Sequence, residues 1–149
     1  MAEIRPVNEY TGMATLSHAF YVVDMGEPEG IALPSMTADT RITATESNSC
    51  LTITAGSSEW DPVKISLLIY GQEPEPLTGD WTHTEAFSCT ATDTPASFTT
   101  GTDPDDMFQD PPPDDLFAMP GLEAPYRWKG RLHVAASGTE EHCLQFWPA

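Results

Sequence analysis

The fold is decided near the C-terminal end, in the stretch Tyr126-Arg-Trp-Lys-Gly-Arg-Leu-His-Val134. One set of alternate positions is mainly apolar, namely Tyr126, Trp128, Leu132 and Val134. The other set is Arg127, Lys129, Arg131 and His133. Because successive side chains of a β-strand point to opposite faces, this alternation predicts a strand with one buried face. Residues 137–140 are typical of a turn, and residues 142–147 predict a returning strand, so the pair is expected to form a hairpin.

The same alternation recurs along the chain, and helical periodicity is nearly absent. Fourteen prolines and ten glycines divide the 149 residues into pieces too short for helices of ordinary length. We predict about eight strands, at residues 14–25, 41–45, 50–54, 62–71, 81–90, 96–99, 126–134 and 142–147. Their spacing and sequential connections favour an all-β fold, an antiparallel two-sheet β-sandwich formed by a single domain of residues 1–149. Residues 1–12 are expected to be an N-terminal extension.

The charge of the chain excludes several classes of partner. It contains 6 Lys and Arg against 23 Asp and Glu, which gives a formal net charge of −17. Six cations cannot outweigh that field at a phosphate backbone or an anionic membrane, so we expect no direct binding of nucleic acid or membrane.

No catalytic motif stands out either. The chain contains no GxSxG, HExxH or Gly-rich phosphate loop. We therefore expect a protein that is not an enzyme and needs no cofactor. The four histidines are spread over the predicted strands without the clustered spacing of a metal site, so structural roles are expected for His18, His83, His133 and His142.

The N-terminus and the cysteines favour a cytoplasmic protein. Residues 1–12 lack the apolar core of a signal peptide, and no stretch has the length of a membrane span. Three widely separated cysteines, Cys50, Cys89 and Cys143, lie in apolar, strand-like runs. We expect three reduced, buried thiols, with a Cys50–Cys143 or Cys89–Cys143 disulfide as the alternative.

One segment, residues 101–121, does not follow the strand pattern. Its central part, residues 103–115, contains six aspartates, four prolines and no cation, so we expect a long, exposed acidic loop. Calcium binding is disfavoured because the EF-hand spacing is missing. Apolar residues interleaved with carboxylates suit docking to a basic protein, and a disordered segment without a partner is the alternative. The expected partner-binding residues are Asp103, Asp105, Asp106, Met107, Phe108, Asp110, Asp114, Asp115 and Phe117.

The polar face of the strand at residues 126–134 holds half of the cations in the chain, namely Arg127, Lys129 and Arg131. A groove for phosphate or RNA has this character, but the adjacent Trp128 points to the opposite face under strict alternation. We favour the interpretation that the three cations offset acidic residues on adjacent strands. The alternative is a ligand-binding or structural module that uses this face for a small anion.

Several motifs resemble known proteins. Residues 125–127, 130–134 and 140–149 resemble the ending of small acidic proteins common in actinomycetes, and Phe20–Asp24 and Gly79–Trp81 also fit that pattern. The overall layout is similar to the competence-protein-J-like family of β-sandwiches, whose representative in bacilli inhibits a nuclease. The resemblance implies the fold more than the function, and the Asp/Pro insert departs from the pattern. Taken with the charge, it leads to the expectation of an inhibitor or immunity-type protein that neutralises a basic protein, such as a nuclease or toxin.

Overall fold

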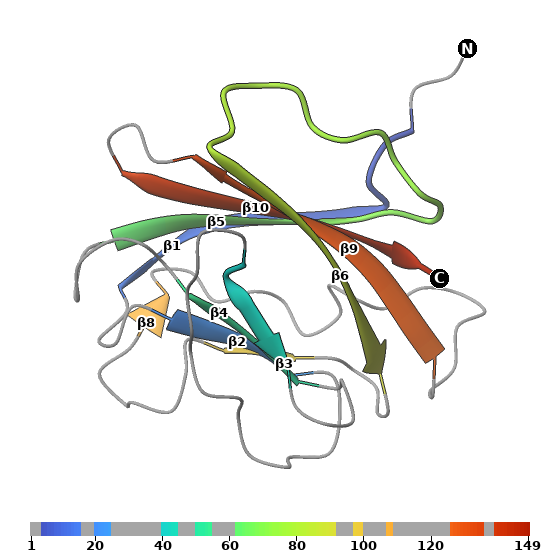
Figure 1. Cartoon of the computed structure of the whole chain (residues 1–149), viewed down its shortest axis with the longest axis horizontal. Helices are drawn as coiled ribbons and strands as arrows, with labels where there is room; N and C mark the ends of the chain where they lie inside the picture. Colours follow the sequence, from blue (N-terminus) through green and yellow to red (C-terminus); the bar gives the residue numbers. More distant parts are fainter. Residues whose placement is uncertain are drawn as a thin grey trace.

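The computed structural model describes residues 4–15, 20–24, 40–44, 50–54, 62–91, 97–99, 107–108, 126–135 and 139–149. Within these ranges the secondary structure consists of ten strands in two sheets (Figure 1). The strands are β1 (Asn8–Thr15), β2 (Phe20–Asp24), β3 (Ile42–Ala44), β4 (Cys50–Thr54), β5 (Pro62–Ile69), β6 (His83–Ala91), β7 (Ser97–Thr99), β8 (Met107–Phe108), β9 (Tyr126–Ala135) and β10 (Glu140–Pro148). The predictions of an all-β chain and of two sheets are confirmed for this part of the molecule.

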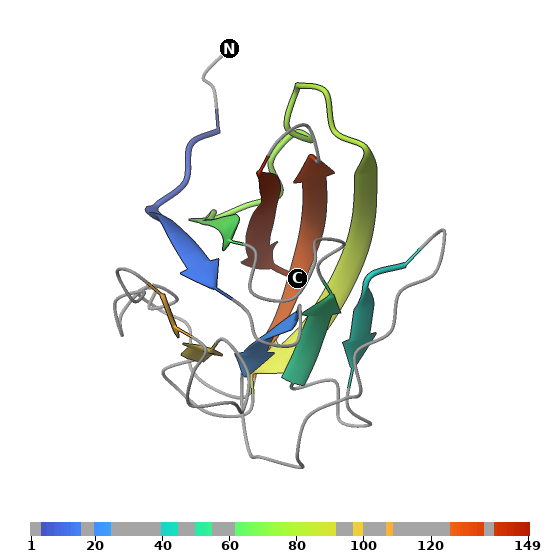
Figure 2. The same cartoon turned by 90° about the vertical axis from the view of Figure 1, so that its left-hand side faces the viewer.

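The larger sheet has six strands in the order β6-β9-β10-β5-β1-β8, and the smaller has four in the order β3-β4-β2-β7. Figure 1 and Figure 2 show the two sheets as separate layers. The predicted hairpin at the C-terminal end is present, because β9 and β10 pair antiparallel from Glu141 opposite Ala135 to Pro148 opposite Trp128.

The expectation of antiparallel pairing is wrong for one pair of strands. β10 runs parallel to β5, while β9 is antiparallel to both β10 and β6. Hence β5 and β6, which follow each other in the sequence, run in the same direction and are separated by the C-terminal hairpin. Strands that run in the same direction need a long crossover connection rather than a tight turn. Residues 70–82, called the connector below, make this crossing and lie on the side of the larger sheet away from the smaller one (Figure 1).

The core lies between the two sheets and takes side chains from both. Four residues of β5 that the alternation placed on one face, Val63, Ile65, Leu67 and Ile69, are fully buried. They form one cluster with Tyr21, Val23, Leu51 and Ile53 of the smaller sheet and with Trp128, Leu132, Leu144 and Phe146 of the hairpin. Burial of this apolar surface is the main force that holds the sheets together. None of the described residues belongs to a helix that could span a membrane.

The N-terminal boundaries differ from the prediction. The predicted strand at residues 14–25 corresponds to two strands, β1 and β2, in different sheets. Part of the predicted N-terminal extension belongs to β1, whose residues from Asn8 onward pair with β5. Its outward residues Glu9 and Thr11 and its inward Gly12 give a weak hydrophobic alternation, which concealed the strand.

Candidate functional site

The outer face of the larger sheet is the face turned away from the smaller sheet. Directly opposed residues of neighbouring strands share a face, so the cross-strand register defines its members. They include Thr84, Ala86 and Ser88 of β6, Arg127, Lys129, Arg131 and His133 of β9, and Cys143 and Gln145 of β10. Trp128 is fully buried on the opposite, inner face, as the alternation predicted.

Gln145 is the centre of a hydrogen-bond network on this outer face. Its Nε2 donates to the backbone carbonyl of Glu75 at 3.0 Å and lies 3.4 Å from the hydroxyl of Tyr70. Its Oε1 accepts from Nη1 of Arg131 at 3.0 Å and from Nε2 of His133 at 3.0 Å. The fully buried Gln145 therefore fastens the connector to both strands of the hairpin.

The network also assigns the tautomer of His133. A backbone carbonyl can only accept, so the contact with Glu75 fixes which atom of the Gln145 amide is the nitrogen. The remaining oxygen is an acceptor, so His133 donates through Nε2 and its proton is on that atom. Burial lowers the pKa of His133, and the charge of Arg131 acts in the same direction against the hydrogen bond to Gln145. The imidazole is thus a neutral donor near pH 7, packed 5.2 Å from the ring of Trp81.

A pocket opens on the outer face beside this network, with a volume of about 460 Å³. We call it the β9 pocket. Its walls include Ala86 and Ser88 of β6, Lys129, Gly130 and Arg131 of β9, and Trp147 of β10. Phe87 and, from the connector, Glu73 complete the lining. The guanidinium carbon of Arg131 lies 4.8 Å from the centre of the Trp147 ring, so the cation is stacked as well as hydrogen-bonded.

The cross-strand neighbours of the β9 cations are uncharged. Arg127 lies opposite Thr90, and Lys129 lies between Ser88 and Trp147. Arg131 lies between Ala86 and Gln145. In the described part of the chain, the ion pairs of Lys and Arg join Arg41 to Glu140 and Lys64 to Glu141, and no carboxylate pairs with the three cations of β9. We expected these cations to offset acidic residues on adjacent strands. Among the described residues, no ion pair supports that interpretation.

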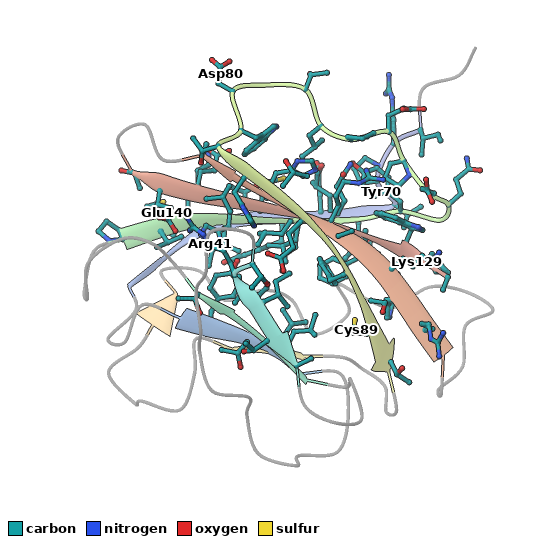
Figure 3. All side chains as sticks on the ribbon, in the orientation of Figure 1. Arg41, Tyr70, Asp80, Cys89, Lys129 and Glu140 are labelled. Carbon is teal, nitrogen blue, oxygen red and sulfur yellow. The ribbon has the colours of Figure 1, made fainter. Side chains whose placement is uncertain are left out.

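A second polar network lies on the inner face, between the two sheets. In the neutral imidazole of His142, Nδ1 accepts from the hydroxyl of Tyr21 at 2.6 Å and Nε2 donates to the carboxylate of Glu140 at 2.5 Å. The guanidinium of Arg41 lies 3.6 Å from the same carboxylate. Figure 3 shows Arg41 and Glu140 side by side at one end of the sheets, and Lys129 towards the other end. This network joins β10 to β2 and to the residue that precedes β3.

Glu85 makes a second connection between the sheets. One carboxylate oxygen accepts from the backbone N–H of Arg41 at 2.7 Å and contacts Nε2 of His83 at 2.9 Å. The other accepts from the hydroxyl of Thr40 at 2.6 Å. Glu85 of β6 therefore provides a hydrogen-bond acceptor for the backbone N–H of Arg41, the residue that precedes β3. His83 and Glu85 share a face, as the sequence indicated.

Burial controls the titration of the inner network. It lowers the pKa of His142, even though the hydrogen bond and the charge of Glu140 act in the opposite direction. Burial also raises the pKa of Tyr21 well above its usual range, with a further contribution from the charge of Glu140. Both groups are therefore held in their neutral forms near pH 7, which suits a structural rather than a catalytic role.

The two cysteines whose side chains are described are buried, free thiols, Cys89 and Cys143. They lie on opposite faces of the larger sheet, since Cys89 is opposite the inward Trp128 and Cys143 is opposite the outward His133. Because Cys143 is a free thiol, both alternatives for a disulfide to Cys143 are wrong. Burial raises the pKa of both thiols to about 12. The side chain of Cys50 lies outside the described residues.

The predicted partner-binding segment is described at two residues. The backbone of Met107 and Phe108 forms β8 and pairs with Thr15 and Ala14 at the edge of the larger sheet, where a loop was expected. Two consecutive residues can pair there because the prolines lie on either side of them in the sequence, at 104 and 111–113. The other expected contact residues lie outside the described part of the chain, namely Asp103, Asp105, Asp106, Asp110, Asp114, Asp115 and Phe117.

The sequence interpretation missed both polar networks. His133 and His142 were expected to be structural, and His18 lies outside the described residues. No group of three or more His, Cys, Asp or Glu side chains is placed to hold a metal ion within the described ranges. The contributions of Tyr21, Arg41 and Gln145 depend on register between strands far apart in the sequence. The sequence offered one indication of the inner network, namely polar residues at inward positions, such as Glu140 and His142.

Comparisons with known proteins support the fold. No protein-family model and no curated protein matches the sequence. Among solved structures, the chain is similar to ComJ from Bacillus subtilis, an inhibitor of the DNA degrading activity of NucA. The TM-score is 0.54 at 8% sequence identity, over 99% of this chain and 100% of that chain. The predicted resemblance to the competence-protein-J-like family is thus confirmed at the level of the fold.

Proposed function

We propose that this protein is a non-enzymatic inhibitor, built on a β-sandwich, that binds a basic protein such as a nuclease or toxin in the cytoplasm. One observation carries the proposal: a net charge of −17 is combined with a fold similar to that of a nuclease inhibitor. A nuclease needs a cationic surface to hold the phosphates of its substrate. An acidic protein of complementary shape can occupy that surface, and long-range attraction makes its capture fast. The free thiols of Cys89 and Cys143 suit a reducing compartment.

We place the contact surface on the acidic segment of residues 103–117. Its carboxylates supply attraction, and its apolar residues supply the anchors that a stable interface needs. The pairing of β8 with β1 supports this assignment, because it fixes the backbone of Met107 and Phe108 to the edge of the larger sheet. A segment tied at its middle loses less conformational entropy on binding than a free one does.

The first experiment identifies the partner. The tagged protein is incubated with lysate of its own host and washed at about 0.1 M and then about 0.5 M salt, a range over which the screening length falls by roughly half. We expect a basic protein that is retained at the lower salt and lost at the higher. Its nuclease activity on DNA should then fall as purified inhibitor is added. Capture of no basic protein, or full nuclease activity at saturating inhibitor, contradicts the proposal.

A second experiment tests the contact surface. The triple variant Asp110→Asn, Asp114→Asn, Asp115→Asn should associate with the partner about tenfold more slowly at low salt and show a flatter salt dependence. The matched control is Glu73→Gln, Glu75→Gln, Asp80→Asn, which removes the same charge from exposed positions of the connector. If both variants associate with the partner equally slowly, the effect is one of net charge alone. That result would contradict the assignment of the contact surface to residues 103–117.

A further inference from the structure

We propose that the β9 pocket binds a small organic anion, through a carboxylate or phosphate group held between Lys129 and Arg131. This inference goes beyond the proposed inhibition and does not depend on it, because it concerns a different part of the molecule and a partner of opposite charge.

The first argument is the distribution of charge. Acidic residues outnumber cations 23 to 6, yet three of the six cations lie on one face of β9. Their neighbours across both adjoining strands are Thr, Ser, Ala, Gln and Trp. Within the described residues none of the three is within ion-pair distance of a carboxylate. As far as the described residues show, the three cations of β9 therefore remain available to an external anion.

The second argument is the fixed position of Arg131. Its guanidinium stacks on Trp147, and both of its hydrogen bonds leave from Nη1, to Gln145 at 3.0 Å and to the carbonyl of Pro74 at 3.4 Å. Within the described residues no hydrogen bond uses Nη2 or Nε, so both are available as donors on a group whose orientation is already set. A guanidinium forms paired hydrogen bonds with carboxylate and phosphate oxygens. Because the side chain is held in place before binding, less entropy is lost when the anion arrives.

The third argument is the space beside the cations. Ala86 and Ser88 have small side chains, and they leave a hollow between the edge strand β6 and the long side chains of β9. Its volume of about 460 Å³ lies within the range of small-molecule sites. Lys129 is exposed at this hollow, two residues from Arg131 on the same face of the strand, and Figure 3 shows it on β9. Two cations of different geometry thus border one cavity.

Glu73 limits what the pocket accepts. This exposed carboxylate of the connector belongs to the lining, and it repels an anion placed near it. The ligand is therefore expected to carry its charge at one end, next to β9, and to turn an uncharged part towards the connector. Substitution of Glu73 by a neutral residue should therefore strengthen anion binding, whereas substitution of a cation should weaken it. General damage to the fold would weaken binding in both variants.

The test is an NMR titration of the full chain, observing backbone amides, with three probes of similar size. Phenyl phosphate and benzoate carry the two candidate anionic groups, and benzyl alcohol is the neutral reference. We expect saturable shifts at β6 and β9 with at least one anion, and the tighter of the two identifies the anionic group. No saturable shift with either anion at millimolar concentration, or equal binding of benzyl alcohol, overturns the proposal.

Three charge variants locate the binding. Lys129→Gln should weaken the affinity about tenfold, the equivalent of one charge-assisted contact. Glu73→Gln should strengthen it. The matched control is Lys64→Gln, which removes one positive charge from the outer face of β5, where Lys64 is 46% exposed and lies 3.9 Å from Glu141. Binding by Lys64→Gln should be unchanged. Equal weakening by Lys64→Gln and Lys129→Gln would show a response to net charge and would overturn the assignment to the pocket.

A fourth variant closes the hollow without changing the charge. Ala86 is exposed on the edge strand, so Ala86→Phe leaves the core intact and fills the space beside Arg131. We expect loss of the anion-dependent shifts with an unchanged unfolding temperature. Undiminished binding by this variant places the anion outside the pocket and contradicts the proposal.

Discussion

The two faces of the larger sheet both carry a histidine in a polar network, but the networks differ in what they leave open. On the inner face, His142 is bonded at both ring nitrogens, to Tyr21 and Glu140, and both partners are buried. On the outer face, Gln145 accepts hydrogen bonds from Arg131 and His133, and Arg131 also lines a pocket. The first network is closed and joins the sheets. The second fixes a cation at the surface, where a ligand can reach it. The predictions below test this difference.

The largest effect is expected on the inner face. His142→Ala leaves the buried hydroxyl of Tyr21 and the carboxylate of Glu140 without their shared partner. Removing one hydrogen bond from a buried hydroxyl and one from a buried carboxylate costs about 1–3 kcal/mol each, and more for the charged group, so we expect a loss of about 3–5 kcal/mol in the free energy of unfolding. Urea denaturation followed by tryptophan fluorescence measures the change. The control is Thr84→Ala at an exposed position of β6, which should stay near the wild-type value.

A smaller loss is expected at the centre of the outer network. Gln145→Ala removes the hydrogen bonds to Arg131, His133 and the carbonyl of Glu75. Of these residues, Arg131 and Glu75 are more exposed than Tyr21 and Glu140 of the inner network. We expect a loss of about 1–3 kcal/mol. Amide hydrogen exchange should also become faster in the connector and remain slow in β5. A loss greater than that of His142→Ala would reverse the comparison between the two faces.

The pH dependence should be dominated by the same two histidines. Their folded pKa values are lowered by burial, so the unfolded chain binds protons first as the pH falls. The stabilisation they provide is present above about pH 6.5, the ordinary pKa of histidine, and is lost as the pH falls below it. Urea midpoints measured from pH 7.5 to pH 5.5 should decrease. His142→Gln should flatten this slope more than His133→Gln, because Tyr21, Glu140, Arg41 and His83 surround a more deeply buried ring.

The smallest effect on stability is expected where binding is proposed. Lys129 is exposed and its charge pairs with no carboxylate among the described residues, so Lys129→Gln should change the free energy of unfolding by less than about 0.5 kcal/mol. Thermal unfolding of the variant and of wild type measures this. A loss comparable to that of Gln145→Ala would mean that Lys129 has a structural role.

Local pattern sufficed to predict most strands, but not their arrangement. The alternation along residues 126–134 and 62–69 indicated which side chains are buried, and Trp128, Leu132 and the apolar positions of β5 confirm it. It could not indicate that β10 inserts beside β5, because parallel pairing depends on contacts between distant segments. β1 was partly missed, since Glu9, Thr11 and Gly12 lack an apolar pattern.

The candidate sites, too, were predictable from local pattern only in part. The cations of β9 were identified from composition and spacing alone. That they border a pocket, and that Gln145 orients Arg131, follows from cross-strand register, which spacing does not determine. Register also excludes the Cys89–Cys143 disulfide, because it places the two residues on opposite faces of one sheet.

The central place of β10 has a consequence for how this chain folds. β5 and β6 are adjacent in the sequence, yet the larger sheet cannot be completed until β9 and β10 have entered between them. The residues between Ile69 and Glu140 must therefore form a large closed loop before the β5–β10 ladder can gain any contact. Such topology, rich in pairs distant in sequence, favours slow folding. Until the hairpin docks, the apolar face of β5 and two unpaired strand edges are exposed, so aggregation is most expected at this stage.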